Sequence, residues 1–106
     1  MRRWNGWGEE TTVVELPDNG RGFLAELVGP GRTLPDATLE QVLAKVPASR
    51  LPEHPLVVRD ARDRLLHARG QSLPDWLAMR EGEFGVFPDG VAYPQTAEQI
   101  RELLKF

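Results

Sequence analysis

Residues 60–82 read DARDRLLHARGQSLPDWLAMREG and contain the densest set of helix signals in this chain. Asp60 is placed to cap a first helix, which we expect to end at Gly70, because glycine suits the left-handed residue that follows many helices. Ser72 starts a second helix, since Ser-Leu-Pro-Asp is a capping box with proline in the first turn. That helix should close at Gly82. The stretch therefore predicts two short helices separated by a brief turn.

Three further segments have helical spacing. The first ends at the stop signal Gly29-Pro30, the second lies between Thr38 and Pro47, and the third begins at Thr96. Glutamine stands three residues after both threonines, which predicts a capping box at each start. The apolar positions that define the three faces are Phe23, Leu24, Leu27, Val28, Leu39, Val42, Leu43, Val46, Ile100, Leu103 and Leu104.

The character of the chain changes after these central helices. Residues 84–87 and 91–93 are rich in strand-forming types and flank the turn tripeptide Pro-Asp-Gly, which predicts a β-hairpin. Residues 47–55 are marked by prolines and should form an extended connector. We therefore expect a mainly α fold with a short β/α unit at its end, divided into a helical part, 1–83, and a second part, 84–106.

Two tryptophans and two glycines open the chain. Gly6 and Gly8 allow a tight turn, and the rings of Trp4 and Trp7 should pack onto a neighbouring surface. Residues 11–16, which follow, are short and β-branched, so a brief extended segment is expected there.

The charge balance argues against two classes of partner. Thirteen basic and 16 acidic side chains leave a net charge of −3, which gives no general attraction to nucleic acid or to anionic lipid. Arginines concentrate at residues 59–69, but Asp60 and Asp63 interrupt them, so a solvated helix face is predicted. No apolar run approaches the ~20 residues of a membrane span. We expect a soluble, cytoplasmic protein.

Few residues are suited to chemistry. The absence of cysteine excludes a disulfide, a thiolate metal site and a cysteine nucleophile. His54 and His67 lie far apart in the sequence, so no metal site is expected; the first should be a connector residue, and the second should lie at a helix end, where its imidazole suits the dipole. Neither Ser49 nor Ser72 has the sequence of a nucleophile elbow, and no glycine run matches a phosphate-binding loop. These residues predict no catalytic centre.

Several short motifs do occur together, namely RLLHARGQSL at 64–73, REG at 80–82, FPDGV at 87–91 and Pro94. Their order and spacing resemble the segment that leads into the flavin domain of alkylglycerone-phosphate synthases and of FAD-linked oxidases of the vanillyl-alcohol-oxidase type. The opening RWNGWG at 3–8 is similar to the tryptophan-rich opening of the same synthases. Residues 9–53 match only loosely.

This resemblance implies an amino-terminal fragment of an FAD-dependent enzyme. Residues 1–83 would be a helical cap, and residues 84–106 the truncated first βα unit of an α+β FAD-binding domain. In such flavoproteins the pyrophosphate loop, the substrate site and the catalytic cluster come later, so no catalytic residue is carried over to this chain. Tyr93 and Pro94 are the sole, weak candidates for contact with FAD. The strand 91–93 would pair with downstream strands.

The partners implied are the remainder of the FAD-binding and substrate domains, with a homodimer as a further expectation. The parent protein would be an oxidoreductase or a synthase-like transferase, and this chain alone would be inactive. The last helix has no terminator before Phe106, and we expect the last ~20 residues to dock onto the helices, onto a second copy or onto later segments.

Two alternatives stay open. The chain could be a stand-alone helical protein-interaction module that binds through its aromatic opening or through its final helix. A small enzyme in its own right is less favoured, since the sequence contains no recognisable nucleophile, metal cluster or phosphate loop.

Overall fold

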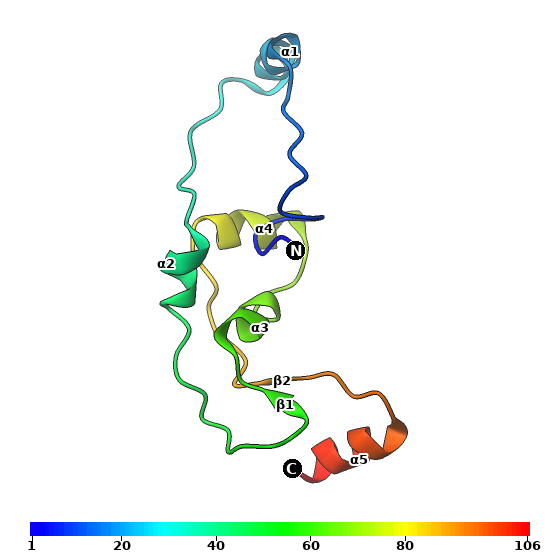
Figure 1. Cartoon of the computed structure of the whole chain (residues 1–106). Helices are drawn as coiled ribbons and strands as arrows, with labels where there is room; N and C mark the ends of the chain where they lie inside the picture. Colours follow the sequence, from blue (N-terminus) through cyan, green and yellow to red (C-terminus); the bar gives the residue numbers. More distant parts are fainter.

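A computed structural model describes all 106 residues as a mostly helical chain with one two-stranded antiparallel sheet. Figure 1 shows the elements in a long, thin arrangement, with principal extents of 56 × 27 × 22 Å. In chain order they are α1 (Asp18–Val28), α2 (Leu39–Leu43), β1 (Val57–Val58), α3 (Ala61–Leu66), α4 (Leu73–Arg80), β2 (Val91–Ala92) and α5 (Ala97–Lys105).

The hydrophobic core lies in the middle of this arrangement. It gathers side chains from the opening turn, from α2, α3 and α4, and from the segment that follows α4. Its six buried members are Trp4, Val42, Leu65, Trp76, Met79 and Phe84. Phe84, which follows residues 1–83, therefore packs in the same small core as side chains from the helices before it.

The caps of the central helices match the sequence. Thr38 and Ser72 each accept a hydrogen bond from the backbone N–H three residues later, and the capping box is complete at both. Asp60 accepts hydrogen bonds from the N–H groups of Arg62 and Asp63, at 2.9 and 3.2 Å, and so starts α3. These side chains satisfy backbone donors that have no partner within the helix.

The predicted end of α3 is wrong. The helix stops at Leu66, with His67 as its C-cap, and Gly70 does not adopt a left-handed conformation. A Cβ at Gly70 would lie 2.8 Å from Oδ2 of Asp75, so this glycine allows a close approach to the start of α4. Gly82 does close the following helix, with a φ of 80°.

The predicted hairpin is also wrong. β2 pairs with β1, with Val58 opposite Val91 and Val57 opposite Ala92. Two features explain the change of partner: Phe84 is buried in the core, and Gly85 has a φ of 72°, which breaks the extended run before the turn. The strand that was expected to pair with downstream segments thus has an upstream partner on one edge.

Arg64 corrects the prediction of a solvated arginine face. Its side chain is only 2% exposed. Nε donates to the carbonyl of Pro88 and Nη1 to the carbonyl of Pro47, both at 2.7 Å. A buried guanidinium needs hydrogen-bond partners. Through these two bonds, α3 holds both the extended connector at Pro47 and the turn at 88–90.

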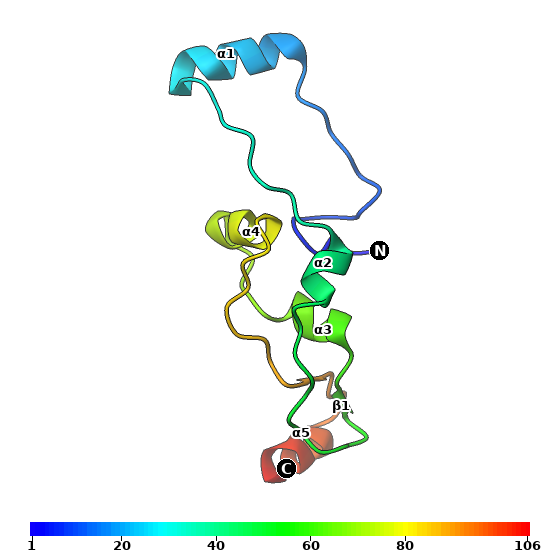
Figure 2. The same ribbon diagram turned by 90° about the vertical axis from the view of Figure 1, so that its left-hand side faces the viewer.

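α1 and α5 lie away from the core at opposite ends of the molecule, as both Figure 1 and Figure 2 show. Neither helix has a buried residue. α1 stands on two extended arms, of which residues 11–16 form no strand. No helix in the structure has both the length and the apolar composition needed to cross a membrane.

Candidate binding cleft

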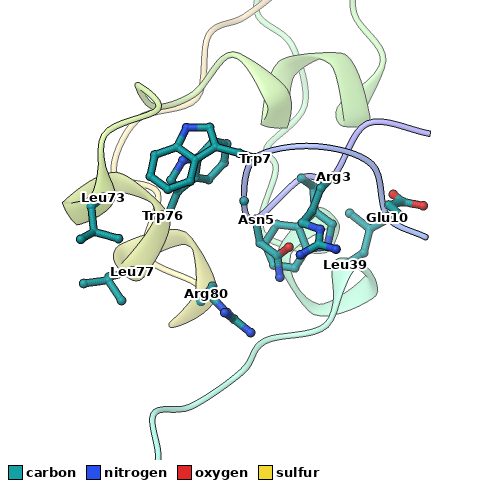
Figure 3. Close-up of a pocket in the computed structure, with 11 residues that line it drawn as sticks. Arg3, Asn5, Trp7, Glu10, Leu39, Leu73, Trp76, Leu77 and Arg80 are labelled. Atoms are coloured by element: carbon teal, nitrogen blue, oxygen red, sulfur yellow. The ribbon is translucent and has the colours of Figure 1, made fainter. Parts of the chain in front are cut away.

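A cleft of about 630 Å³ lies between the opening turn and α4. Figure 3 shows the residues that line it, with Trp7 and Trp76 close together. Its volume falls within the range of small-molecule sites, roughly 300–1,000 Å³. This cleft combines the largest volume with the most aromatic lining, and it is therefore the best candidate for a functional site.

The opening turn supplies one wall. The N–H of Arg3 donates to the carbonyl of Gly8 at 3.0 Å, and Arg2 forms an isolated antiparallel bridge with Glu9. Gly8 has a φ of 84°, which only glycine adopts readily. The turn holds Trp4 in the core against Phe84, with ring centroids 6.3 Å apart. The predicted tight turn is confirmed.

Trp7 has a different role from Trp4. Its ring meets Trp76 edge-on, with centroids 5.9 Å apart and an interplanar angle of 79°, yet the residue remains 60% exposed. An edge-to-face pair is a favoured aromatic arrangement. Trp7 is therefore a fixed, accessible apolar surface on the wall of the cleft.

α4 supplies the opposite wall. The residues that line the cleft follow the spacing i, i+3, i+4, i+7, which places them on one helix face: Leu73, Trp76, Leu77 and Arg80. Leu73 and Leu77 are exposed, whereas Trp76 is buried and its Nε1 atom has no hydrogen-bond partner. The wall is thus apolar with one unsatisfied donor beneath it.

The rim of the cleft is charged, and its groups hold neighbouring segments. Arg80 Nε lies 3.3 Å from Oδ1 of Asp36, and Glu10 Oε1 lies 2.9 Å from Nη2 of Arg62. Arg3 Nη2 donates to the carbonyls of Glu9 and Thr12. The cleft can therefore receive an apolar surface flanked by charges, and it contains no nucleophile paired with a base.

Tyr93 and Pro94, the two candidates for contact with a flavin, lie outside this cleft. The Tyr93 hydroxyl donates to Oδ1 of Asp63 at 2.6 Å, and this bond to the carboxylate raises the pKa of Tyr93 above its usual range. The hydroxyl ties the end of β2 to α3. Pro94 is exposed and has no N–H to offer.

The polar groups around the cleft and at the start of α5 already have hydrogen-bond partners. Pyrophosphate needs a cradle of free backbone amides or unpaired basic groups, but Thr96 and Ser72 cap the first amides of α5 and α4. Arg3 and Arg80 already hold backbone carbonyls and a carboxylate.

The histidines occupy structural positions at opposite sides of β1. His54 Nδ1 accepts from the N–H of Leu56, and Nε2 lies 3.3 Å from Oε1 of Glu102, while the ring packs on Phe106. His67 is the C-cap of α3, as its predicted place at a helix end requires, and its Nδ1 lies 2.7 Å from the carbonyl of Asp63. No group of three or more His, Asp or Glu side chains is close enough to hold a metal ion.

Asp89 is the centre of a second polar cluster, which is structural. Its Oδ2 accepts from Nη2 of Arg50 at 2.6 Å, its backbone carbonyl accepts from the hydroxyl of Ser49, and Arg64 lies 4.0 Å away. The hydrogen bonds from Arg50 lower the pKa of the Asp89 carboxyl below its usual range. The FPDGV motif thus fastens the turn before β2 onto the extended connector.

Sequence reasoning identified the aromatic anchors of the cleft but missed the cleft itself. The spacing of Leu73, Leu77 and Arg80 around Trp76 indicated one helix face, but a period cannot say which segment lies opposite. That opposite segment, the opening turn, is some 70 residues away in the sequence. Only the fold brings the two together.

Comparison with known proteins gives one similar sequence. Protein Rv2250A of Mycobacterium tuberculosis (strain ATCC 25618 / H37Rv) is 30% identical over 102 residues, which cover 87% of this chain and 68% of that protein. No family model matches the chain. No solved structure matches it either.

Proposed function

This chain belongs to the same family as protein Rv2250A of Mycobacterium tuberculosis, and we propose that it forms the amino-terminal cap and the first βα unit of an FAD-linked oxidoreductase or alkylglycerone-phosphate-synthase-like enzyme. The chain alone is then inactive. FAD, the substrate and the catalytic groups are held by later parts of the parent protein. The motifs between residues 64 and 94 are the basis of the proposal.

The observation that best supports the proposal is that β2 and α5 each have an edge or face without a packing partner. β2 has a strand on one edge only, and α5 has an apolar face that nothing covers: Leu104 is 82% exposed and Ile100 48%. In a βα unit the helix packs its apolar face against a sheet that needs further strands. The turn around His54 touches only the far end of α5. A larger flavin domain would supply the missing sheet.

The residues that carry the resemblance have structural roles in this chain, which fits a fixed shape in front of a flavin domain. Asp89 holds the connector, and a Cβ at Gly90 would lie 2.5 Å from Cγ1 of Val57, so only glycine fits under β1. Both act to place β2. Under the proposal, the FPDGV motif sets the position of β2, which would be the first strand of the flavin domain.

The proposal allows two classes of reaction. A synthase would exchange an acyl for an alkoxy chain on a dihydroxyacetone-phosphate backbone, whereas a bacterial relative would oxidise a small hydroxy compound with its flavin. We place the parent protein in the cytoplasm. Trp4 belongs to the core, so the opening turn is part of the fold.

The test uses the gene and the protein it encodes. The coding sequence that follows the codon for Phe106 should specify a glycine-rich FAD loop after one further strand. The encoded protein, purified whole, should show flavin absorption and release FAD on acid denaturation. A Leu104→Asp variant should lose most of the bound flavin, while Val86→Asp, at another exposed apolar position, should retain it. A protein without the loop and without flavin refutes the proposal.

The cleft favours a second candidate, a protein-interaction module. Its walls of Trp7, Leu73 and Leu77 present exposed apolar surface on a fixed support. This candidate predicts that Trp7→Ala abolishes capture of a partner with the fold intact. Trp4→Ala does not provide the same test, because Trp4 is a core residue and its loss would unfold the chain.

A further inference from the structure

α1 and its two arms form an apolar surface with no counterpart in their own copy of the chain. The arms and the helix expose seven large apolar side chains: Val13, Val14, Leu16, Phe23, Leu24, Leu27 and Val28. Together these expose on the order of 700 Å² of apolar surface, close to the ~800 Å² that each partner buries in a standard specific interface. A surface of this size on a small protein marks an interaction site.

The roots of the arms are held beside the cleft. Arg3 donates to the carbonyl of Thr12 at the root of the first arm. At the root of the second arm, the N–H of Ala37 donates to the carbonyl of Arg80 at 2.8 Å, and Asp36 pairs with the same arginine. These bonds fix the points at which both arms leave the core, and Figure 2 shows α1 at the end of the arms, apart from α4.

The cleft and α1 both combine an apolar surface with flanking charges. The apolar stripe of α1 is flanked by Glu26 on one side and by Arg21 on the other, by the 100° spacing of a helix. The rim of the cleft has Arg80 on one side and Glu10, beside Arg3, on another, and about half of its lining is apolar. Each flank of the helix can therefore meet a rim group of opposite sign.

We propose that α1 of one copy docks into the tryptophan-lined cleft of a second copy, and that the reciprocal contact makes a two-fold symmetric dimer by exchange of arms. Arms of about seven residues can extend over roughly 25 Å, enough to carry α1 across to a neighbour. Reciprocal exchange is a common route to a closed dimer. The inference does not depend on the flavin proposal, and it gives the expected homodimer a specific interface.

Solution mass gives the first test. The purified chain should sediment at twice its 11.9 kDa mass. Phe23→Ser with Leu27→Ser on α1, and Trp7→Ala in the cleft, should each return the mass to that of a monomer with unchanged helical circular dichroism. Leu104→Ser on α5, a matched exposed position, should leave the dimer intact. A wild-type monomer at micromolar concentration overturns the proposal.

Cross-linking separates exchange from folding back, and the chain has no cysteine of its own to interfere. A Leu27→Cys chain mixed with a Leu77→Cys chain and treated with a short bis-maleimide should give a covalent dimer on a denaturing gel, at least tenfold more than either chain alone. The double variant in one chain should also cross-link between copies. A cross-link confined within one copy, or none, overturns the proposal, and both results leave the flavin proposal untouched.

Discussion

α4 and α1 make an instructive pair, because similar local signals produce both helices and only one of them is buried. Each begins after an extended residue and ends before a glycine with a φ near 80°. α4 buries Trp76 and Met79 against side chains from four other segments, whereas α1 buries nothing. Local sequence signals therefore decide where a helix forms, whereas the packing of that helix against other segments decides how much it stabilises the protein.

The largest effect should come from the core itself. Leu65 is fully buried at the centre of the molecule, and Leu65→Ala leaves a cavity that costs about 2–5 kcal/mol. In a protein with so few buried residues we expect most of the cooperative unfolding transition in urea to be lost. Leu27→Ala on α1, where the residue is 64% exposed, should change the free energy of unfolding of the monomer by less than ~0.5 kcal/mol. Equal losses in tryptophan-monitored titrations would contradict the division into centre and periphery.

A glycine pair sharpens the comparison at the level of the backbone. Gly90→Ala would push a methyl group onto Val57 under β1, and overpacking of this kind costs about 1–3 kcal/mol. Gly31→Ala, in the second arm of α1, meets no atom within 4 Å and should be neutral or slightly stabilising. Thermal unfolding of the two variants measures the difference. A neutral Gly90→Ala would mean that the pairing of β1 with β2 is dispensable.

Removal of a helix cap should act globally at α4 and locally at α5. Ser72→Ala removes a complete capping box from a helix of the core and should lower the free energy of unfolding by about 0.5–2 kcal/mol. Thr96→Ala removes the cap of α5, which buries no residue. It should speed amide hydrogen exchange in α5 alone and leave the global unfolding midpoint unchanged. A shift of that midpoint would show that α5 is coupled to the core.

The smallest effect concerns the Arg50–Asp89 pair in acid. The pKa of Asp89 is lowered in the folded protein, so its contribution to stability is complete above the ordinary carboxyl pKa of about 4 and is lost as the pH falls through the lower, folded value. Asp89→Asn should therefore flatten the acid limb of a stability-versus-pH curve. Glu15→Gln, which changes an exposed carboxylate without an ion pair, is the control and should follow the wild-type curve.

Local chemistry was readable from the sequence, and tertiary pairing was not. α4 begins and ends at its predicted residues, α1 ends at its predicted glycine and α2 begins at its predicted cap, because side-chain caps and left-handed glycines act over four residues at most. The end of α2 was wrong, since the helix stops at Leu43, before Pro47. At α5 only half of the predicted capping box forms. Thr96 accepts from the N–H of Gln99, but the Gln99 side chain bonds the N–H of Gln95 instead of closing the box.

The misses at β2 and at Arg64 involve residues far apart in the chain. A hairpin was the shortest pairing available to Val91, but burial of Phe84 removed the local partner and left Val58 to take its place. Arg64 was read as solvated because its neighbours are charged, although its partners at 47 and 88 lie well outside one helix turn.

By itself, the sequence determined where helices start and stop, that no cysteine chemistry is possible, and that the tryptophans are anchors. Only the tertiary structure decided that Trp4 is core while Trp7 lines a cleft, which arginine is buried, and which amphipathic faces stay uncovered. The physical reason is range: capping and backbone sterics act within a few residues, whereas burial depends on which distant segments the whole chain brings together.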